Sequence, residues 1–300
     1  AQDSRMNNLC RSVIFFCATI ALTTQHSVAS GDDAVAQYSE RAIELLRDAI
    51  SRETAHGQGL VPAYAESLRQ VFLEAGFSPE ALTIVPYGET ASLVVRYEGD
   101  GSSGREPILF SSHMDVVPAD PESWLRHPFE LQADDTFFYG RGVLDNKFDV
   151  TILTTLFMWL KESGFVPSRD LVIAFTGDEE SFQETVQQLA RDYRDLVDAE
   201  YALVVDGGGG VLNDTGEAIQ FQVGFAEKTY ATFSMSAKNP GGHSSMPRAD
   251  NAIYDLARAI QRLEAYTFPV ETNEITLTYF ARTLAVEKSR SVSANFCAFM

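Results

Sequence analysis

Three apolar runs in this 300-residue chain end directly in acidic or imidazole side chains. They cover residues 108–110, 171–175 and 201–205, and their branched and aromatic composition is typical of buried strands. Charge beside a buried strand costs free energy unless it is neutralised or used. Acids also gather in solvated loops, and this chain is acidic. That explanation accounts poorly for three repeats of one arrangement, so we expect a functional site at these strand ends.

The side chains after these runs are candidate metal ligands. The first run leads to His113 and Asp115, the second to Glu179 and Glu180, and the third to Asp206. An imidazole followed two residues later by a carboxylate suits a metal site, because one group can ligate while the other fixes the ring tautomer. Taken alone, such a pair at a strand end is more often a hydrogen-bonded loop pair.

Helical and strand patterns alternate along the first two thirds of the chain. Helical periodicity is expected over residues 33–51, 62–75, 148–163 and 181–193, and a further strand over 92–97. This alternation predicts βαβ units, and therefore an α/β fold with a mostly parallel sheet flanked by helices. In such sheets ligands bind at the carboxyl ends of the strands, where all the candidate side chains lie.

The chain changes character after Asp206. Glycine-rich loops follow, alternating patterns over residues 218–236 and 271–281 predict strands, and an amphipathic helix is expected from Ile253 to Leu263. Between them a glycine-containing loop carries His243. We expect a separate α+β segment with its boundary near residues 222–227.

Net charge and the N-terminus limit the partners and location. The net charge of −19 argues against binding to nucleic acid or to an anionic membrane. Residues 1–30 resemble a signal peptide, with two arginines before a ten-residue apolar run and small residues at 28–30. We therefore expect an exported protein, periplasmic or secreted, with no membrane contact after cleavage. Cys297 would be the only cysteine left, which excludes an internal disulfide.

Five motifs in order carry a family resemblance. They are His113-x-Asp115, Tyr139-Gly-Arg-Gly-x-x-Asp145-x-Lys147, Asp178-Glu179-Glu180, Asp206 and Gly242-His243. Their order and spacing resemble the aminoacylase and carboxypeptidase family of two-zinc hydrolases. Trp124 and His127-Pro128-Phe129 are similar to its glycine-X carboxypeptidase and N-acyl-amino-acid hydrolase branch. The resemblance implies a catalytic domain over residues 31–222 and an inserted, incomplete lid and dimerisation domain over 223–300.

The resemblance also implies a role for each site residue. His113 and Asp206 would bind one zinc ion, Glu180 the other, and Asp145 would bridge the two. Asp115 would hold His113, and Glu179 would be the general base. His243 would support the carbonyl oxygen, reaching across a homodimer. The substrate would be a small peptide or an N-acyl amino acid, and a cis peptide bond is expected at Asp145–Asn146.

The sequence departs from the family pattern in two places. Residues 181–185 replace the small residues and glycines that usually follow the paired glutamates. The lid arginine and the last histidine ligand of the second zinc do not occur before Met300. We therefore expect a fragment or a truncated product, and poor activity from these 300 residues alone.

Two other functions compete with a zinc-dependent amide hydrolase. The first is a catalytically impaired relative that only binds metal or regulates. The second is an acidic secreted binding domain with calcium or no metal, although residues 145–149 lack the glycine and distal glutamate of a calcium loop. Cobalt or manganese could also replace zinc, because carboxylate-rich sites accept several metals.

Overall fold

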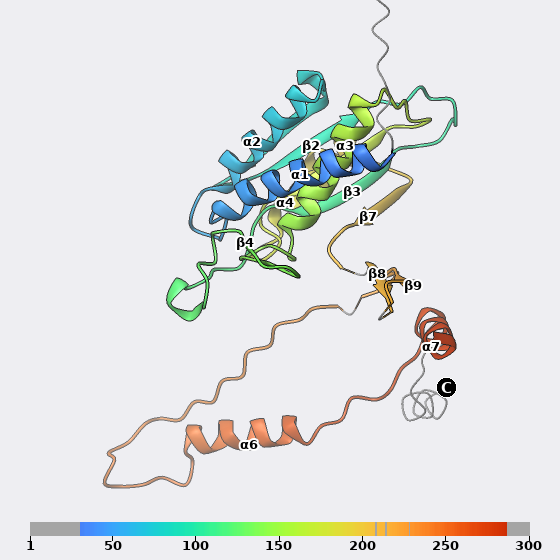
Figure 1. Ribbon diagram of the computed structural model, residues 1–300. Helices are drawn as coiled ribbons and strands as arrows, with labels where there is room; N and C mark the ends of the chain where they lie inside the picture. The colour runs from blue at the N-terminus through green and yellow to red at the C-terminus, as the bar shows by residue number, and fades with distance from the viewer. Residues whose placement is uncertain (1–30, 208, 214, 228, 287–300) are drawn as a thin grey trace, which may run out of the picture. The chain divides into compact units, whose positions relative to one another are not determined.

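A computed structural model describes residues 31–207, 209–213, 215–227 and 229–286 (Figure 1). The chain divides into two compact units, Ala1–Leu203 and Val204–Met300. This division comes before the boundary expected near residues 222–227, and the assignment of catalytic and lid domains stays a prediction. The expected signal peptide and Cys297 lie outside the described residues.

The first unit contains five helices and seven strands within its described part. The helices are α1 (Gly31–Ser51), α2 (Val61–Glu74), α3 (Lys147–Glu162), α4 (Glu184–Asp192) and α5 (Arg194–Val197), with short 3-10 turns η1 (Pro79–Ala81) and η2 (Pro121–Ser123). The strands are β1 (Leu82–Tyr87), β2 (Thr90–Tyr97), β3 (Ile108–His113), β4 (Gln132–Ala133), β5 (Phe138–Tyr139), β6 (Leu171–Thr176) and β7 (Tyr201–Val204), which ends at the unit boundary.

The main sheet has the strand order β1-β2-β6-β3-β7. β3 pairs with β6 in parallel, and α3 lies in the connection between them, which confirms the predicted βαβ unit. β2 is antiparallel to both β1 and β6, so β1, β3 and β6 run one way and β2 runs the other. The fold is thus α/β with a mixed sheet. β1, a strand the sequence did not predict, joins β2 through a two-residue turn at Gly88 and Glu89, which makes this pair antiparallel.

Helices cover both faces of this sheet. Phe157 of α3 packs against Tyr97 and Phe110 on one face, with ring centroids 6.2 and 5.9 Å apart, and α1 lies beside α3 (Figure 1). On the other face Leu189 of α4 joins Val94 and other buried residues of the sheet. Fully burying a side chain as large as Phe157 contributes roughly 1.5–3 kcal/mol to stability. Because alternate strand residues face opposite sides of the sheet, the apolar residues on each face determine where a helix can bury such a side chain.

Helices α2 and α3 end in the same way. Gly76 and Gly164 both take left-handed φ values, of 90° and 73°, directly after the last turn. The next residue donates its backbone N–H back into the helix, from Phe77 to Phe72 O and from Phe165 to Leu160 O, each at 3.0 Å. This Schellman arrangement satisfies carbonyls that the helix leaves open. The glycines therefore stop the helices where the sequence predicted.

The second unit contains β8 (Gly209–Leu212), β9 (Ala218–Gln222), α6 (Ala252–Glu264) and α7 (Glu274–Val286). The amphipathic helix is confirmed as α6. The strand pattern over residues 218–236 is confirmed in part by β9, and where the structure describes residues 223–236 it has no further strand. The strand predicted over residues 271–281 is wrong, because residues 274–286 are helical. The side chain of Asn273 accepts the backbone N–H of Thr276 at 2.9 Å and starts this helix, a cap that outweighs the alternating pattern.

Within residues 31–286, apart from the three single-residue gaps, no helix has both the length and the apolar character needed to cross a bilayer.

Candidate metal centre

Three predicted ligands meet at one edge of the sheet. Single ligand atoms of His113, Asp145 and Glu180 all lie within 4.8 Å of one another. His113 is the last residue of β3, Glu180 lies in the loop after β6, and Asp145 stands just before α3. Because β3 and β6 are parallel neighbours, their carboxyl ends coincide, and this brings residues 67 positions apart to one place.

The His113 ring is buried and held from one side. Its side chain is 2% exposed, and Nδ1 lies 3.0 Å from the backbone oxygen of Asp115 and 3.3 Å from its Oδ1. Nε2, on the other side of the ring, lies 3.0 Å from Asp145 Oδ1. With a metal ion held by Nε2 and Asp145, the ring would carry its proton on Nδ1 and donate it to Asp115, as a metal-binding histidine does.

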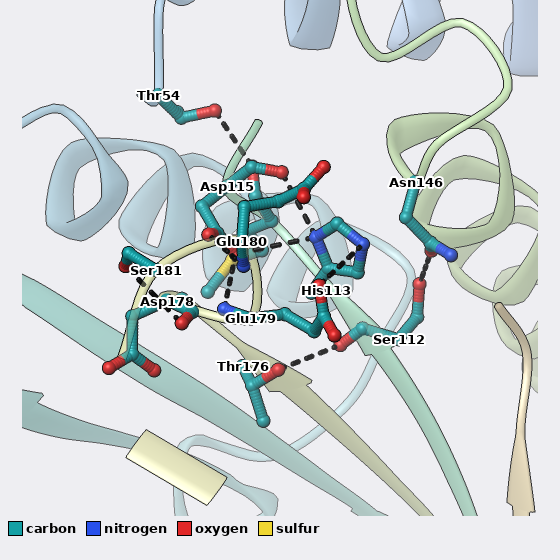
Figure 2. Close-up of polar contacts among 12 residues, drawn as sticks. Thr54, Ser112, His113, Asp115, Asn146, Thr176, Asp178, Glu179, Glu180 and Ser181 are labelled. Atoms are coloured by element: carbon teal, nitrogen blue, oxygen red, sulfur yellow. Dashed lines mark hydrogen bonds and ion pairs between the residues drawn. The ribbon is translucent and has the colours of Figure 1, made fainter. Parts of the chain in front are cut away.

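Asp115 also holds the loop that carries the paired glutamates. Its Oδ1 accepts the backbone N–H of Glu179 and its Oδ2 that of Glu180, both at 3.0 Å, as Figure 2 shows beside the His113 ring. One carboxylate, on a side chain that is 5% exposed, thus connects the ends of β3 and β6. The sequence predicted the contact to His113 but not the two bonds to the glutamate loop.

Asp178 fixes the far side of the same loop. Its carboxylate accepts the backbone N–H of Glu184 at 2.8 Å and of Thr185 at 3.0 Å, which are orphan donors of the first turn of α4. Its backbone oxygen accepts the N–H of Gln183 at 2.8 Å. From the sequence alone, Asp178 had no predicted role of its own. The signal for this role was an aspartate shortly before a predicted helix.

The turn that carries Asp145 is tied to its surroundings on both sides. The predicted cis peptide bond at Asp145–Asn146 is confirmed. The Asn146 side chain accepts the hydroxyl of Ser112, and Lys147 donates Nζ to the backbone oxygens of Ala49 and Arg52, at 2.8 and 2.6 Å. Burial lowers the pKa of Lys147 to about 7. The Asp145-x-Lys147 spacing therefore anchors the ligand turn to the end of α1.

The charges at this site favour a bound cation. Burial, followed by the neighbouring Asp145 carboxylate, raises the pKa of Glu180. A cation between the carboxylates would offset both effects. Two ligands of one tetrahedral zinc ion lie about 3.3 Å apart, close to the 3.0 Å between His113 Nε2 and Asp145 Oδ1. One nitrogen and two carboxylates form a donor set that zinc, cobalt or manganese accepts.

Two predicted site residues belong to the second unit. Asp206 follows β7 and is exposed. His243 is also exposed, and its Nδ1 lies 2.8 Å from Ser245 Oγ and accepts the Ser245 backbone N–H at 3.2 Å. The two units are described separately, so the roles of Asp206 as a ligand and of His243 as an oxyanion donor stay predictions. The roles assigned to His113, Asp115, Asp145, Glu179 and Glu180 also stay predictions.

Residues 109–293 match the family described as Peptidase family M20/M25/M40, which is more than half of the chain. The chain belongs to this family. The match includes all the residues of the candidate metal centre and extends into the second unit.

Individual relatives match over shorter stretches. The chain is 34% identical over 172 residues to the N-fatty-acyl-amino acid synthase/hydrolase PM20D1.1 of Danio rerio, covering 56% of this chain and 33% of that protein. It is 34% identical over 180 residues to the probable carboxypeptidase S-like 2 of Dictyostelium discoideum, covering 58% and 34%. The chain thus spans about a third of the length of these two relatives.

Solved structures show weaker similarity. The dipeptidase Dug1p of Saccharomyces cerevisiae superimposes with a TM-score of 0.49 at 21% identity, over 60% of this chain and 41% of that one. Human carnosine dipeptidase 1 gives a TM-score of 0.47 at 19% identity, over 60% and 42%.

Gln183 contacts the site, and the sequence alone did not predict this contact. Among the described residues it is the one non-glycine with left-handed φ, at 56°, and it stands at the N-cap of α4. Its side-chain amide donates to Glu179 Oε1 at 3.1 Å. The sequence did show a departure from the family's small residues here, and the structure places a left-handed residue within that departure.

Replacing Gln183 with glycine should stabilise the chain. The left-handed conformation costs an L-residue about 1–2 kcal/mol, so we expect the free energy of unfolding to rise by about 1 kcal/mol. Urea denaturation measures this. Gln187, an exposed residue within α4, is the matched control, and Gln187→Gly should lower stability by about 1 kcal/mol. If both variants are destabilised, Gln183 is not strained.

Proposed function

We propose that this chain is a metal-dependent hydrolase that cleaves the amide bond of a small peptide or an N-acyl amino acid. The observation that carries the proposal is the convergence of His113, Asp145 and Glu180, with Asp115 bound to both ligand-bearing strand ends. Membership of peptidase family M20/M25/M40 supports the reaction class. The names of the relatives, an N-fatty-acyl-amino acid hydrolase and a carboxypeptidase-like protein, support the substrate class.

In this mechanism His113 and Asp206 would hold one zinc ion and Glu180 the second, with Asp145 as a ligand of both, as the family pattern implies. When bound, zinc supplies Lewis-acid polarisation of the scissile carbonyl and lowers the pKa of water. Glu179 Oε2 lies 4.0 Å from His113 Nε2, beside the ligands. Its carboxylate takes the proton from the attacking water and gives it to the leaving amine. Gln183 and the Asp115-bound backbone hold Glu179 in place.

Glu179→Gln should abolish most of the activity and leave metal binding intact. Proton transfer by a placed carboxylate contributes about 10²–10⁴-fold, so kcat for N-acyl amino acids should fall by at least about 100-fold. Zinc content, measured by atomic absorption, should be unchanged, because Glu179 is not assigned as a ligand. Glu184→Gln, at the first residue of α4, is the control and should retain wild-type kcat.

The assay also separates the competing functions. A wild-type chain that binds zinc and hydrolyses no N-acyl amino acid or dipeptide would identify a catalytically impaired metal-binding protein. A chain that binds calcium but not zinc would contradict the proposal altogether.

Export and dimerisation are part of the same proposal. We propose that residues 1–30 direct export and are removed, and that the second unit contributes to a homodimer. N-terminal sequencing of the mature protein and sedimentation analysis test these two points.

A further inference from the structure

A cavity lies beside the turn that leads to Asp145. Its volume is about 550 Å³, and it is lined by residues 123–127, 138–140, 143 and 144. This is within the range of about 300–1,000 Å³ that small-molecule pockets occupy. Most of the lining is aromatic or aliphatic, and it contains no acidic residue although the chain carries a net charge of −19.

Residues 123–127 form the first wall of this cavity and residues 138–140, 143 and 144 the second, and the two segments contact each other. Arg126 of the first wall lies over the ring of Tyr139 in the second, 4.1 Å from its centroid. In return Arg141 lies over the ring of Trp124, at 5.2 Å. The Arg141 backbone N–H also donates to Pro128 O at 2.7 Å. These reciprocal contacts preform the cavity before any ligand binds.

A lining residue of the cavity directly precedes a candidate ligand in the sequence. Leu144 lines the cavity and is 81% exposed, and the next residue is Asp145, whose Oδ1 lies 3.0 Å from His113 Nε2. Consecutive Cα atoms are about 3.8 Å apart. A substrate whose amide carbonyl lies at the ligands can therefore place the adjoining group against Leu144 and Phe138.

We propose that this cavity, bounded by Trp124, Phe138, Tyr139 and Leu144, binds the aliphatic acyl chain of an N-acyl amino acid. The choice of ligand rests on the proposed function. The acyl chain fits better than the amino-acid half, because that half carries a carboxylate, most of the lining is apolar, and Arg126, the arginine among the lining residues, already lies against the ring of Tyr139. The cavity then selects substrates by acyl length, since each buried methylene adds to binding.

The test measures binding without hydrolysis. Calorimetry with N-acetyl-, N-hexanoyl- and N-decanoylglycine, below their micelle concentrations and with a chelator present, gives the affinity of the wild-type chain. We expect affinity to rise with acyl length by up to about fourfold for each methylene. Phe138→Ser and Leu144→Ser, both at exposed positions, should reduce this dependence at least about tenfold for the decanoyl compound, each by losing apolar area.

Phe137→Ser is the matched control. Phe137 is 62% exposed and adjacent to Phe138 but does not line the cavity, so its replacement should leave the length dependence unchanged. No rise of affinity with length, or equal losses in the Phe137 and Phe138 variants, would overturn the inference. The inference would also be overturned if the wild-type chain is a dimer, Leu144→Ser dissociates it, and the dependence of affinity on acyl length persists in that variant. Leu144 would then contact a second copy of the chain and not the acyl chain. Length-dependent binding by a chain that hydrolyses none of these compounds would contradict the proposed hydrolysis and leave the binding site standing.

Discussion

Replacing Asp115 with asparagine should weaken zinc binding by about 10- to 100-fold, the usual loss when the partner of a metal-bound histidine is changed. The effect here has two sources. The His113 ring loses its charged acceptor, and the loop of Glu179 and Glu180 loses one of two backbone bonds, because an amide offers one oxygen where the carboxylate offers two. Zinc affinity is measured by competition with a chelating dye.

The same substitution should destabilise the metal-free chain. An unsatisfied buried N–H facing the new amide costs about 1–3 kcal/mol, and we expect a loss of about 2–3 kcal/mol in urea denaturation. Asp120→Asn is the control. Asp120 is exposed and also accepts a backbone N–H, from Glu122 at 3.0 Å, but it lies outside the ligand cluster. It should change neither quantity, and zinc affinity that persists in the Asp115 variant would contradict the arrangement described.

Replacing Gly177 with alanine should have the largest effect on stability. A Cβ atom there would lie 2.4 Å from the backbone oxygen of Ala91, 2.3 Å from Thr90 Oγ1 and 2.7 Å from Val61 Cγ1. The backbone oxygen cannot move without shifting β2, which is paired with β1 on one side and β6 on the other. We expect a loss of about 3 kcal/mol or more, at the upper end for overpacked sites, by urea denaturation.

Gly224 provides the comparison for this prediction. A Cβ atom added there would meet no other atom within 4 Å, and the residue has no left-handed φ. Gly224→Ala should therefore shift stability by less than about 0.5 kcal/mol. Equal stability of the Gly177 variant and the wild type would show that β2 and the glutamate loop are not in contact as described.

The sequence identified candidate side chains better than the supports around them. His113, Asp145 and Glu180, which the structure brings together, could be named because each follows a strand or the turn behind one, and their roles as ligands stay predictions. Asp178 and Gln183 could not, because their roles depend on where α4 begins relative to the end of β6. The helix at 274–286 was missed because alternation over a short apolar run does not separate strand from helix.

By itself the sequence determined the alternation of strands and helices, the placement of acids and an imidazole at strand ends, and membership of a metallopeptidase family. Those features depend on residue types and spacing along the chain. Only the tertiary structure decided that β2 is reversed, that one buried carboxylate holds both ligand-bearing strand ends, and that an aromatic cavity adjoins Asp145. Each of these depends on contacts between residues distant in sequence, and one-dimensional periodicity carries no information about such contacts.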